Sequence, residues 1–174
     1  MKFQYMLLPI ALIGCDAATT TDTSIPTEEI HSMFRKINDQ ISVSPQITLD
    51  DIVAAKADGV SLIINNRPDG EDPSAPQSAE IEAAAKAAGI DYVTIPITHS
   101  GFSAPQVDAM IEALADSKGK ILAYCRSGTR STFLWSLAQA KQGVSPDEIA
   151  RLAGNAGYDI TPVRAMIDAL AAGS

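Results

Sequence analysis

The sequence contains few of the residues that build disulfide frameworks and metal sites. Among 174 residues there are two cysteines, Cys15 and Cys125, and two histidines, His31 and His99. A disulfide scaffold needs more cysteines, and a dedicated metal site needs a Cys/His cluster, so we expect neither a metal nor another cofactor. Aromatic residues make up only 5% of the chain. This composition fits alanine-rich helices packed on a small sheet better than a β-sandwich.

Basic charge is also scarce. Thirteen Lys and Arg residues against 21 Asp and Glu residues give a formal net charge of -8, and no stretch concentrates Lys and Arg. Nucleic-acid binding therefore lacks its electrostatic footprint, and we expect no nucleic-acid partner. The chain is 46% hydrophobic and long enough for one domain with a full core.

The first 15 residues are organised like an export signal. Lys2 precedes an apolar run over residues 3–13, which is too short for an ordinary membrane-spanning helix. The run ends in Leu-Ile-Gly-Cys, which resembles a bacterial lipoprotein signal. That resemblance implies cleavage before Cys15 and attachment of lipid to this residue. An ordinary secretory signal that contains a cysteine is the alternative.

The residues after Cys15 are typical of a tether between a lipid and a domain. Residues 16–30 begin with the polar, Thr-rich stretch DAATTTDTS. We therefore expect a lipoprotein on the periplasmic face of the membrane, in contact with the bilayer only through its lipid. Asp16 resembles the residue that retains such lipoproteins at the inner membrane. The catalytic domain is expected over residues 31–174, where Cys125 would have no disulfide partner.

Apolar runs and turn formers alternate along this domain. Strands are expected within 30–47, as one or two short segments, and over 60–65, 92–96 and 120–124. Helices are expected over 48–57, 79–88 and 103–116, from the end of the 125–131 loop to 142, and from 145 and 161 onward. This order predicts an α/β fold with a small, mostly parallel sheet flanked by helices. Active sites in such folds lie at the carboxyl ends of the strands.

The sequence CRSGTRS at residues 125–131 is the clearest chemical motif. A cysteine between a strand and a helix lies where backbone N–H groups and the helix dipole favour the thiolate. We expect Cys125 to be a nucleophile and Arg130 to hold two oxygens of a tetrahedral anion. Gly128 permits the loop to curl around the anion. Ser131 is placed to donate a hydrogen bond to the sulfur.

The other residues of this loop are substrate-binding candidates. Arg126, Ser127 and Thr129 are expected to face solvent or the incoming anion. The structural alternative is an inert, buried cysteine beside a basic turn.

Phosphate ester hydrolysis also needs a general acid, which is worth about 10²–10⁴ in rate. The loop over residues 98–102 contains no carboxylate, so the candidates are His99 on that loop and Asp69 or Glu71 on the preceding one. We take Asp69 as the catalytic candidate, although it also fits a simple turn. Arg67 is expected either to recruit the anion or to pair with Asp69.

The motif CRSGTRS resembles the cysteine loops of two groups of enzymes. Rhodanese-like sulfurtransferases have four residues between the cysteine and a basic residue, and they form a cysteine persulfide. Tyrosine and dual-specificity phosphatases have five, and they form a phosphocysteine. The spacing here is the rhodanese one, and Tyr124 stands where phosphatases usually have a histidine.

Four segments together resemble the phosphatase-like domain of the beta-lactamase hydrolase-like family. They are ISVSPQIT (41–48), IINNRPDGE (63–71), AEIEAAAKAAGIDYVTIPI (79–97) and AYCRSGTRS (123–131). The resemblance covers about residues 35–160 and implies the dual-specificity-phosphatase fold, Cys125 as nucleophile and Arg130 as anion clamp.

The resemblance implies a cysteine-dependent hydrolase that acts on a small phosphoryl substrate. A rhodanese-like sulfurtransferase, acting through a Cys125 persulfide on thiosulfate or a persulfide, is one alternative. It needs no strong general acid, because sulfite or a thiolate leaves readily. A non-catalytic anion-binding module is the other alternative.

Overall fold

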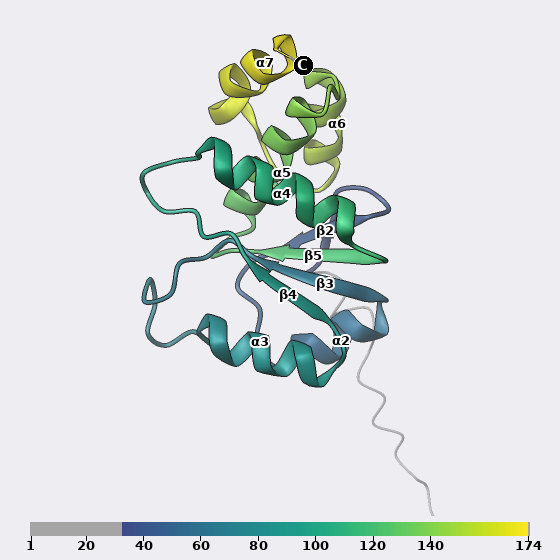
Figure 1. Cartoon of the computed structure of the whole chain (residues 1–174), viewed down its shortest axis with the longest axis vertical. Coiled ribbons are helices and arrows are strands. Elements are labelled where there is room, and N and C mark those ends of the chain that lie inside the picture. Colours follow the sequence, from purple (N-terminus) through teal and green to yellow (C-terminus); the bar gives the residue numbers. More distant parts are fainter. Residues whose placement is uncertain (1–32, 174) are drawn as a thin grey trace, which may run out of the picture.

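The computed structural model describes residues 33–173 (Figure 1). The predicted export signal, Cys15 and the polar tether lie outside the described residues, as does His31. Within the described part of the chain, no helix has the length and apolar character needed to cross a membrane.

A five-stranded sheet forms the centre of the domain, in the order β1-β2-β5-β3-β4. The strands are β1 (Arg35–Lys36), β2 (Ile41–Ser44), β3 (Val60–Asn65), β4 (Asp91–Thr94) and β5 (Lys120–Tyr124). Strand β1 is antiparallel to β2, and all the other pairs are parallel. The predicted mostly parallel sheet is therefore confirmed. Strand β5 lies in the middle of the sheet, so the residue that follows it, Cys125, emerges at the centre of the carboxyl edge.

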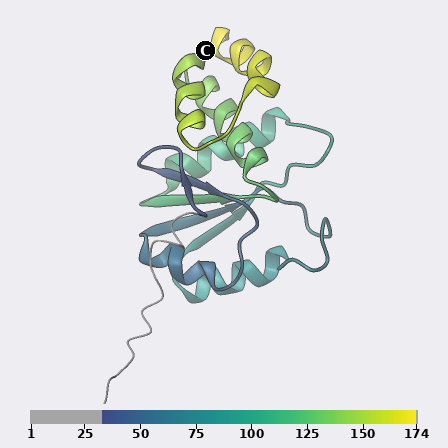
Figure 2. The same ribbon diagram turned by 180° about the vertical axis from the view of Figure 1, so that it is seen from behind.

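Helices cover both faces of the sheet (Figures 1 and 2). One face carries α2 (Asp51–Ala57) and α3 (Ser78–Ala87). The other carries α4 (Ala104–Asp116) and α5 (Thr129–Lys141). The remaining elements lie outside α4 and α5 on the same side: α6 (Pro146–Asn155), the short 3-10 helix η1 (Thr161–Val163) and α7 (Arg164–Ala172).

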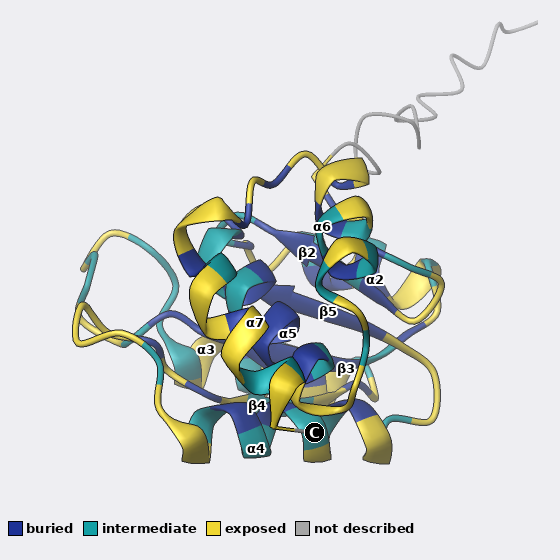
Figure 3. Cartoon of the chain, turned by 90° about the horizontal axis from the view of Figure 1, so that it is seen from above, coloured by how far each residue is buried: buried dark blue, intermediate teal, exposed yellow. Residues whose placement is uncertain are grey.

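The hydrophobic core is divided between the two faces of the sheet. Ile63 and Leu122 point toward α2 and α3, whereas their neighbours Ile64 and Ala123 point toward α4 and α5. Successive strand residues point to opposite faces, so strands covered on both sides must be apolar at nearly every position. The continuous runs at 60–65 and 120–124 have this pattern. Figure 3 shows the buried sheet beneath helices whose outer faces are exposed.

Two element boundaries lie two or three residues from their predicted positions. The helix expected from Thr48 begins at Asp51. Thr48 N and Oγ1 both donate to Asp51 Oδ2, at 2.7 and 2.9 Å, and Asp51 N donates to Thr48 Oγ1 at 3.4 Å, so the two residues form a capping pair at the start of the helix. The strand expected to end at Pro96 ends at Thr94, although Ile95 N still donates to Asn65 O at 2.8 Å.

Candidate active site

Three loops meet at the carboxyl edge of the sheet, as the sequence predicts. Asn66 N donates to Tyr124 O at 2.8 Å, which joins the loop after β3 to the end of β5. Ile97 N donates to Asn66 O at 3.0 Å, which adds the loop after β4. These backbone bonds bring residues 66–77 and 95–103 next to the Cys125 loop.

Cys125 lies at the base of its loop with its side chain fully buried. Its Sγ accepts a hydrogen bond from Gly128 N at 3.2 Å. Gly128 has φ +85°, a left-handed conformation that side chains rarely adopt, and it precedes the first residue of α5. Thr132 N and Oγ1 both donate to Gly128 O at 2.9 Å. The chain therefore curls back, and an amide N–H points at the sulfur.

The side chain of Tyr158 packs directly against Gly128 and leaves no room for a Cβ there. A Cβ added there would lie 2.0 Å from Tyr158 Oη and 2.8 Å from its Cζ. We expect Gly128→Ala to lower the free energy of unfolding by about 2–4 kcal/mol, from the left-handed backbone and the overlap together. Urea unfolding monitored by circular dichroism measures this loss.

Gly143 provides the matched control. It has nearly the same φ, +86°, but nothing lies within 4 Å of an added Cβ. Gly143→Ala should therefore show only the backbone cost, about 1–2 kcal/mol. Equal losses of unfolding free energy in the two variants would show that overlap with Tyr158 does not destabilise Gly128→Ala.

Arg130 is fixed in place by groups from the two neighbouring loops. Its Nη1 donates to Ile97 O at 2.7 Å, and its Nη2 donates to both carboxylate oxygens of Glu71, at 3.0 and 2.8 Å. A guanidinium has five N–H donors. These bonds leave the Nε–H and one Nη1 N–H of Arg130 without a partner among residues 33–173. Protein groups thus engage part of the guanidinium, and its role as an anion clamp stays a prediction.

Glu71 joins two arginines. Besides Arg130, its Oε2 accepts from Arg67 Nε at 3.3 Å. Burial acts to raise the pKa of Glu71, but the hydrogen bonds and charges of Arg130 and Arg67 outweigh it and lower the pKa below its ordinary value. Glu71 is therefore ionised at neutral pH. Its pairing with the two arginines disfavours a role as general acid, and the choice among Glu71, Asp69 and His99 stays a prediction.

Replacing Glu71 tests this pairing through its pH dependence. The lowered pKa means that the carboxylate stabilises the fold above its ordinary pKa of 4.5 and loses this effect as the pH falls through the folded-state value. Glu71→Gln should be less stable than the wild type at pH 7, and the difference should shrink progressively below about pH 4.5. Thermal unfolding of both proteins across this range measures it. A difference that stays constant with pH would contradict the ion pair.

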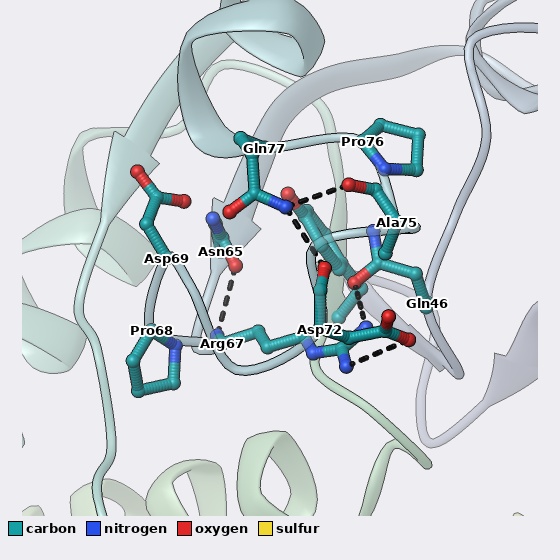
Figure 4. Close-up of a pocket in the computed structure, with 10 residues that line it drawn as sticks. Gln46, Asn65, Arg67, Pro68, Asp69, Asp72, Ala75, Pro76 and Gln77 are labelled. Atoms are coloured by element: carbon teal, nitrogen blue, oxygen red, sulfur yellow. Dashed lines mark hydrogen bonds and ion pairs between the residues drawn. The ribbon is translucent and has the colours of Figure 1, made fainter.

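Arg67 is buried, with 8% of its side chain exposed. Its Nη1 donates to Gln46 Oε1 at 2.8 Å and its Nη2 lies 3.5 Å from Asp72 Oδ2. The predicted pairing with Asp69 is wrong, because the guanidinium points away from that residue toward Gln46 and Asp72 (Figure 4). The side chain of Arg67 instead pairs with Glu71 and helps to hold it in place. Direct contact between Arg67 and an anion stays a prediction.

Asp69 has a structural contact of its own. Its Oδ1 accepts from Ser78 N at 2.8 Å at the start of α3, and it lies at the edge of the small polar pocket in Figure 4. Asp69 and Gly70 also form a turn, with Gly70 at φ +77°. The turn interpretation is therefore correct, and the catalytic role of Asp69 stays a prediction. His99 is exposed on the loop after β4, and its role as an acid also stays a prediction.

The remaining loop residues differ in exposure. Arg126 and Ser127 are exposed and Thr129 is half-buried, and their contact with an anion stays a prediction. Ser131 is fully buried, and its Oγ has no hydrogen-bond partner. The predicted bond to the sulfur is thus not formed. In a loop of this length Ser131 already lies within α5. The hydrogen bond to the sulfur comes from Gly128 N instead.

Tyr124 lies in the position where phosphatases usually have a histidine, and it contacts other hydroxyl groups. Its Oη is 3.2 Å from Tyr92 Oη, which in turn is 3.0 Å from Asn65 Nδ2 and Ser78 Oγ. Burial raises the pKa of Tyr124, and the hydrogen bond with Tyr92 raises it further. It therefore stays neutral. Among residues 33–173 there is no group of three or more His, Cys, Asp or Glu side chains that could hold a metal ion.

The family model described as "Beta-lactamase hydrolase-like protein, phosphatase-like domain" matches residues 33–142. The chain belongs to this family. This chain is 33% identical over 125 residues to the beta-lactamase hydrolase-like protein of Xylella fastidiosa strain Temecula1. The match covers 71% of this chain and 29% of the relative. The protein of the same name from Agrobacterium fabrum strain C58 is 32% identical over 126 residues, 72% of this chain and 29% of that one. The match thus spans less than a third of the length of these relatives.

Solved structures of similar proteins agree with the fold. A protein from Neisseria meningitidis Z2491 that is proposed to be a phosphatase has a TM-score of 0.71 and 31% identity, over 80% of this chain and 98% of that chain. A protein from Shewanella putrefaciens CN-32, also proposed to be a phosphatase, has a TM-score of 0.65 and 26% identity, over 81% and 92% of the two chains. PTPMT1 in complex with PI(5)P, at 11% identity and a TM-score of 0.63 over 81% and 98%, shows the fold alone. The predicted phosphatase-like fold is confirmed.

Proposed function

We propose that this protein is a cysteine-dependent phosphatase that acts on a small phosphate monoester. The observation that carries the proposal is the surroundings of Cys125. Its sulfur accepts an amide N–H at the carboxyl end of the central strand, and the guanidinium of Arg130, at the end of the same motif, is fixed by Ile97 O and Glu71. An amide donor and a fixed cation favour both a thiolate and a bound anion.

The proposed reaction has two steps. The Cys125 thiolate attacks the phosphorus, so that an S–P bond forms while the P–O bond to the alcohol breaks and the alcohol leaves with its electron pair. Water then attacks the phosphocysteine, the S–P bond breaks, and inorganic phosphate and the thiolate are released. Loop N–H groups and the Nε–H of Arg130 would bind the phosphoryl oxygens in both steps.

The leaving oxygen needs a proton in the first step. Because Glu71 is ionised by its two arginines, the proton would come from Asp69, from His99 or from water. A poorly supplied proton slows esters of basic alcohols more than esters of acidic phenols. We therefore expect the enzyme to prefer aryl phosphates to alkyl phosphates.

Substrate access requires movement of the loop. The side chain of Cys125 is fully buried, whereas Arg126 and Ser127 beside it are exposed. The exposed guanidinium of Arg126 would meet an incoming anion first.

Sulfur transfer is the competing function, and the short spacing between Cys125 and Arg130 is the observation in its favour. The full-length protein should be assayed with p-nitrophenyl phosphate and, separately, for thiocyanate formation from thiosulfate and cyanide. We expect p-nitrophenol release and no thiocyanate above the background. Thiocyanate formation without phosphate release would overturn the proposal in favour of a sulfurtransferase.

A further inference from the structure

Tyr158 lies against the back of the Cys125 loop, although α5 and α6 separate the two in sequence. Its side chain is buried, and its hydroxyl donates to Ser127 O at 3.2 Å. The phenol is so close to Gly128 that an added Cβ would overlap it. Tyr158 lies beyond residues 33–142, where the family model matches. The contact is therefore supplied by the C-terminal part of this chain.

The hydrogen bond from Tyr158 reaches the sulfur through one peptide group. The carbonyl of Ser127 and the N–H of Gly128 belong to the same planar peptide unit. Its oxygen accepts from Tyr158 Oη, and its N–H donates to Cys125 Sγ, each at 3.2 Å. A donor on the carbonyl polarises the peptide and strengthens its N–H as a donor. It also fixes the rotation of the peptide plane with the N–H toward the sulfur.

We propose that Tyr158 is a positioning residue for the nucleophile, whose hydroxyl orients and polarises the Ser127–Gly128 peptide so that its N–H stabilises the Cys125 thiolate. The inference rests on the proposed function, because this stabilisation matters only if the thiolate attacks a substrate.

Two further observations support this role. The guanidinium carbon of Arg35 lies 5.2 Å from the centre of the Tyr158 ring, so β1 holds the ring in place through a cation–π contact. Burial raises the pKa of Tyr158; the Arg35 charge acts to lower it and the Cys125 charge to raise it, and the net change is upward. The hydroxyl therefore keeps its proton, and remains a donor, throughout the pH range in which a thiol ionises.

The test is the pH dependence of Cys125 alkylation in the full-length protein. Tyr158→Phe keeps the ring over Gly128 and removes only the hydroxyl. Iodoacetamide labelling, quantified by mass spectrometry on the peptide that contains Cys125, should show a midpoint about half a pH unit higher than in the wild type. Tyr92→Phe is the matched control, because its hydroxyl bonds Tyr124, Asn65 and Ser78 but not the loop. Its midpoint should be that of the wild type.

The outcomes separate this inference from the proposed function. A wild-type midpoint below that of free cysteine, unchanged by Tyr158→Phe, overturns the positioning role and leaves the proposed function standing. A wild-type midpoint at about 8.5, the value for free cysteine, overturns the proposed function and the inference with it.

A second measurement needs no variant and so does not depend on how Tyr158→Phe folds. In the wild-type protein, the ¹³Cζ chemical shift of Tyr158 should change with pH at the same midpoint as Cys125 alkylation, because the two groups share one peptide. A shift that stays flat through that midpoint contradicts the coupling.

Discussion

Replacing Cys125 by serine is expected to lower kcat for p-nitrophenyl phosphate by at least about 10³-fold. The hydroxyl has nearly the shape of the thiol, so the loop and its Gly128 N contact can persist. At neutral pH, however, serine supplies almost no anionic nucleophile. Steady-state kinetics of the purified variant, with thermal unfolding as a check on folding, measure the loss.

The other cysteine provides the control for this substitution. Cys15→Ser, outside the described residues, should leave kcat unchanged, since Cys125 is the thiol at the carboxyl edge of the sheet. A Cys125→Ser protein as active as the wild type would eliminate covalent catalysis and leave the anion-binding module as the better interpretation.

Arg130→Lys is expected to lower kcat/KM by about 10²–10³-fold, although the charge is kept. Arg130 uses Nη1 and Nη2 to hold Ile97 O and Glu71 and still has Nε–H for an anion. An ammonium group cannot span these partners, because its donors radiate from one atom. The variant should therefore be unable to hold Ile97 O and Glu71 together, and it loses the Nε–H donor to the phosphoryl group.

Arg151→Lys is the matched control for the same exchange on the surface. Arg151 pairs with Glu148 on α6, where its side chain is 57% exposed, and surface ion pairs contribute little. Its kcat/KM should equal that of the wild type. If Arg130→Lys were equally active, a simple positive charge would suffice, and the planar clamp would play no part in catalysis.

The fold was predictable where the sequence signal is local. The runs VSLIIN and KILAY are apolar at nearly every position because their strands are covered on both faces, and the two elements form over the predicted residues. The start of α6 follows from Ser145, whose Oγ accepts from Glu148 N at 3.3 Å. The position of Cys125 at the carboxyl edge follows from the strand–loop–helix order alone.

The contacts that organise the site were not predictable in the same way. Glu71 and Arg130 are 59 residues apart, and many carboxylates could have paired with that arginine. The neighbouring motif NNRPDGE indicated that its residues lie near the site, but not that Arg67 turns toward Asp72 and away from Asp69. Tyr158 belongs to no recognisable motif, because it reaches the loop only through the packing of α6 against α5.

The central claim is that Cys125 forms a covalent bond to phosphorus, and the mass of the trapped intermediate tests it most directly. The full-length protein would be mixed with p-nitrophenyl phosphate, quenched in acid within one turnover and digested for mass spectrometry. We predict that the peptide containing Cys125 gains one phosphoryl group, and that this gain is absent in Cys125→Ser. Phosphate release without any adduct on that peptide, or an adduct on another residue, would contradict the account.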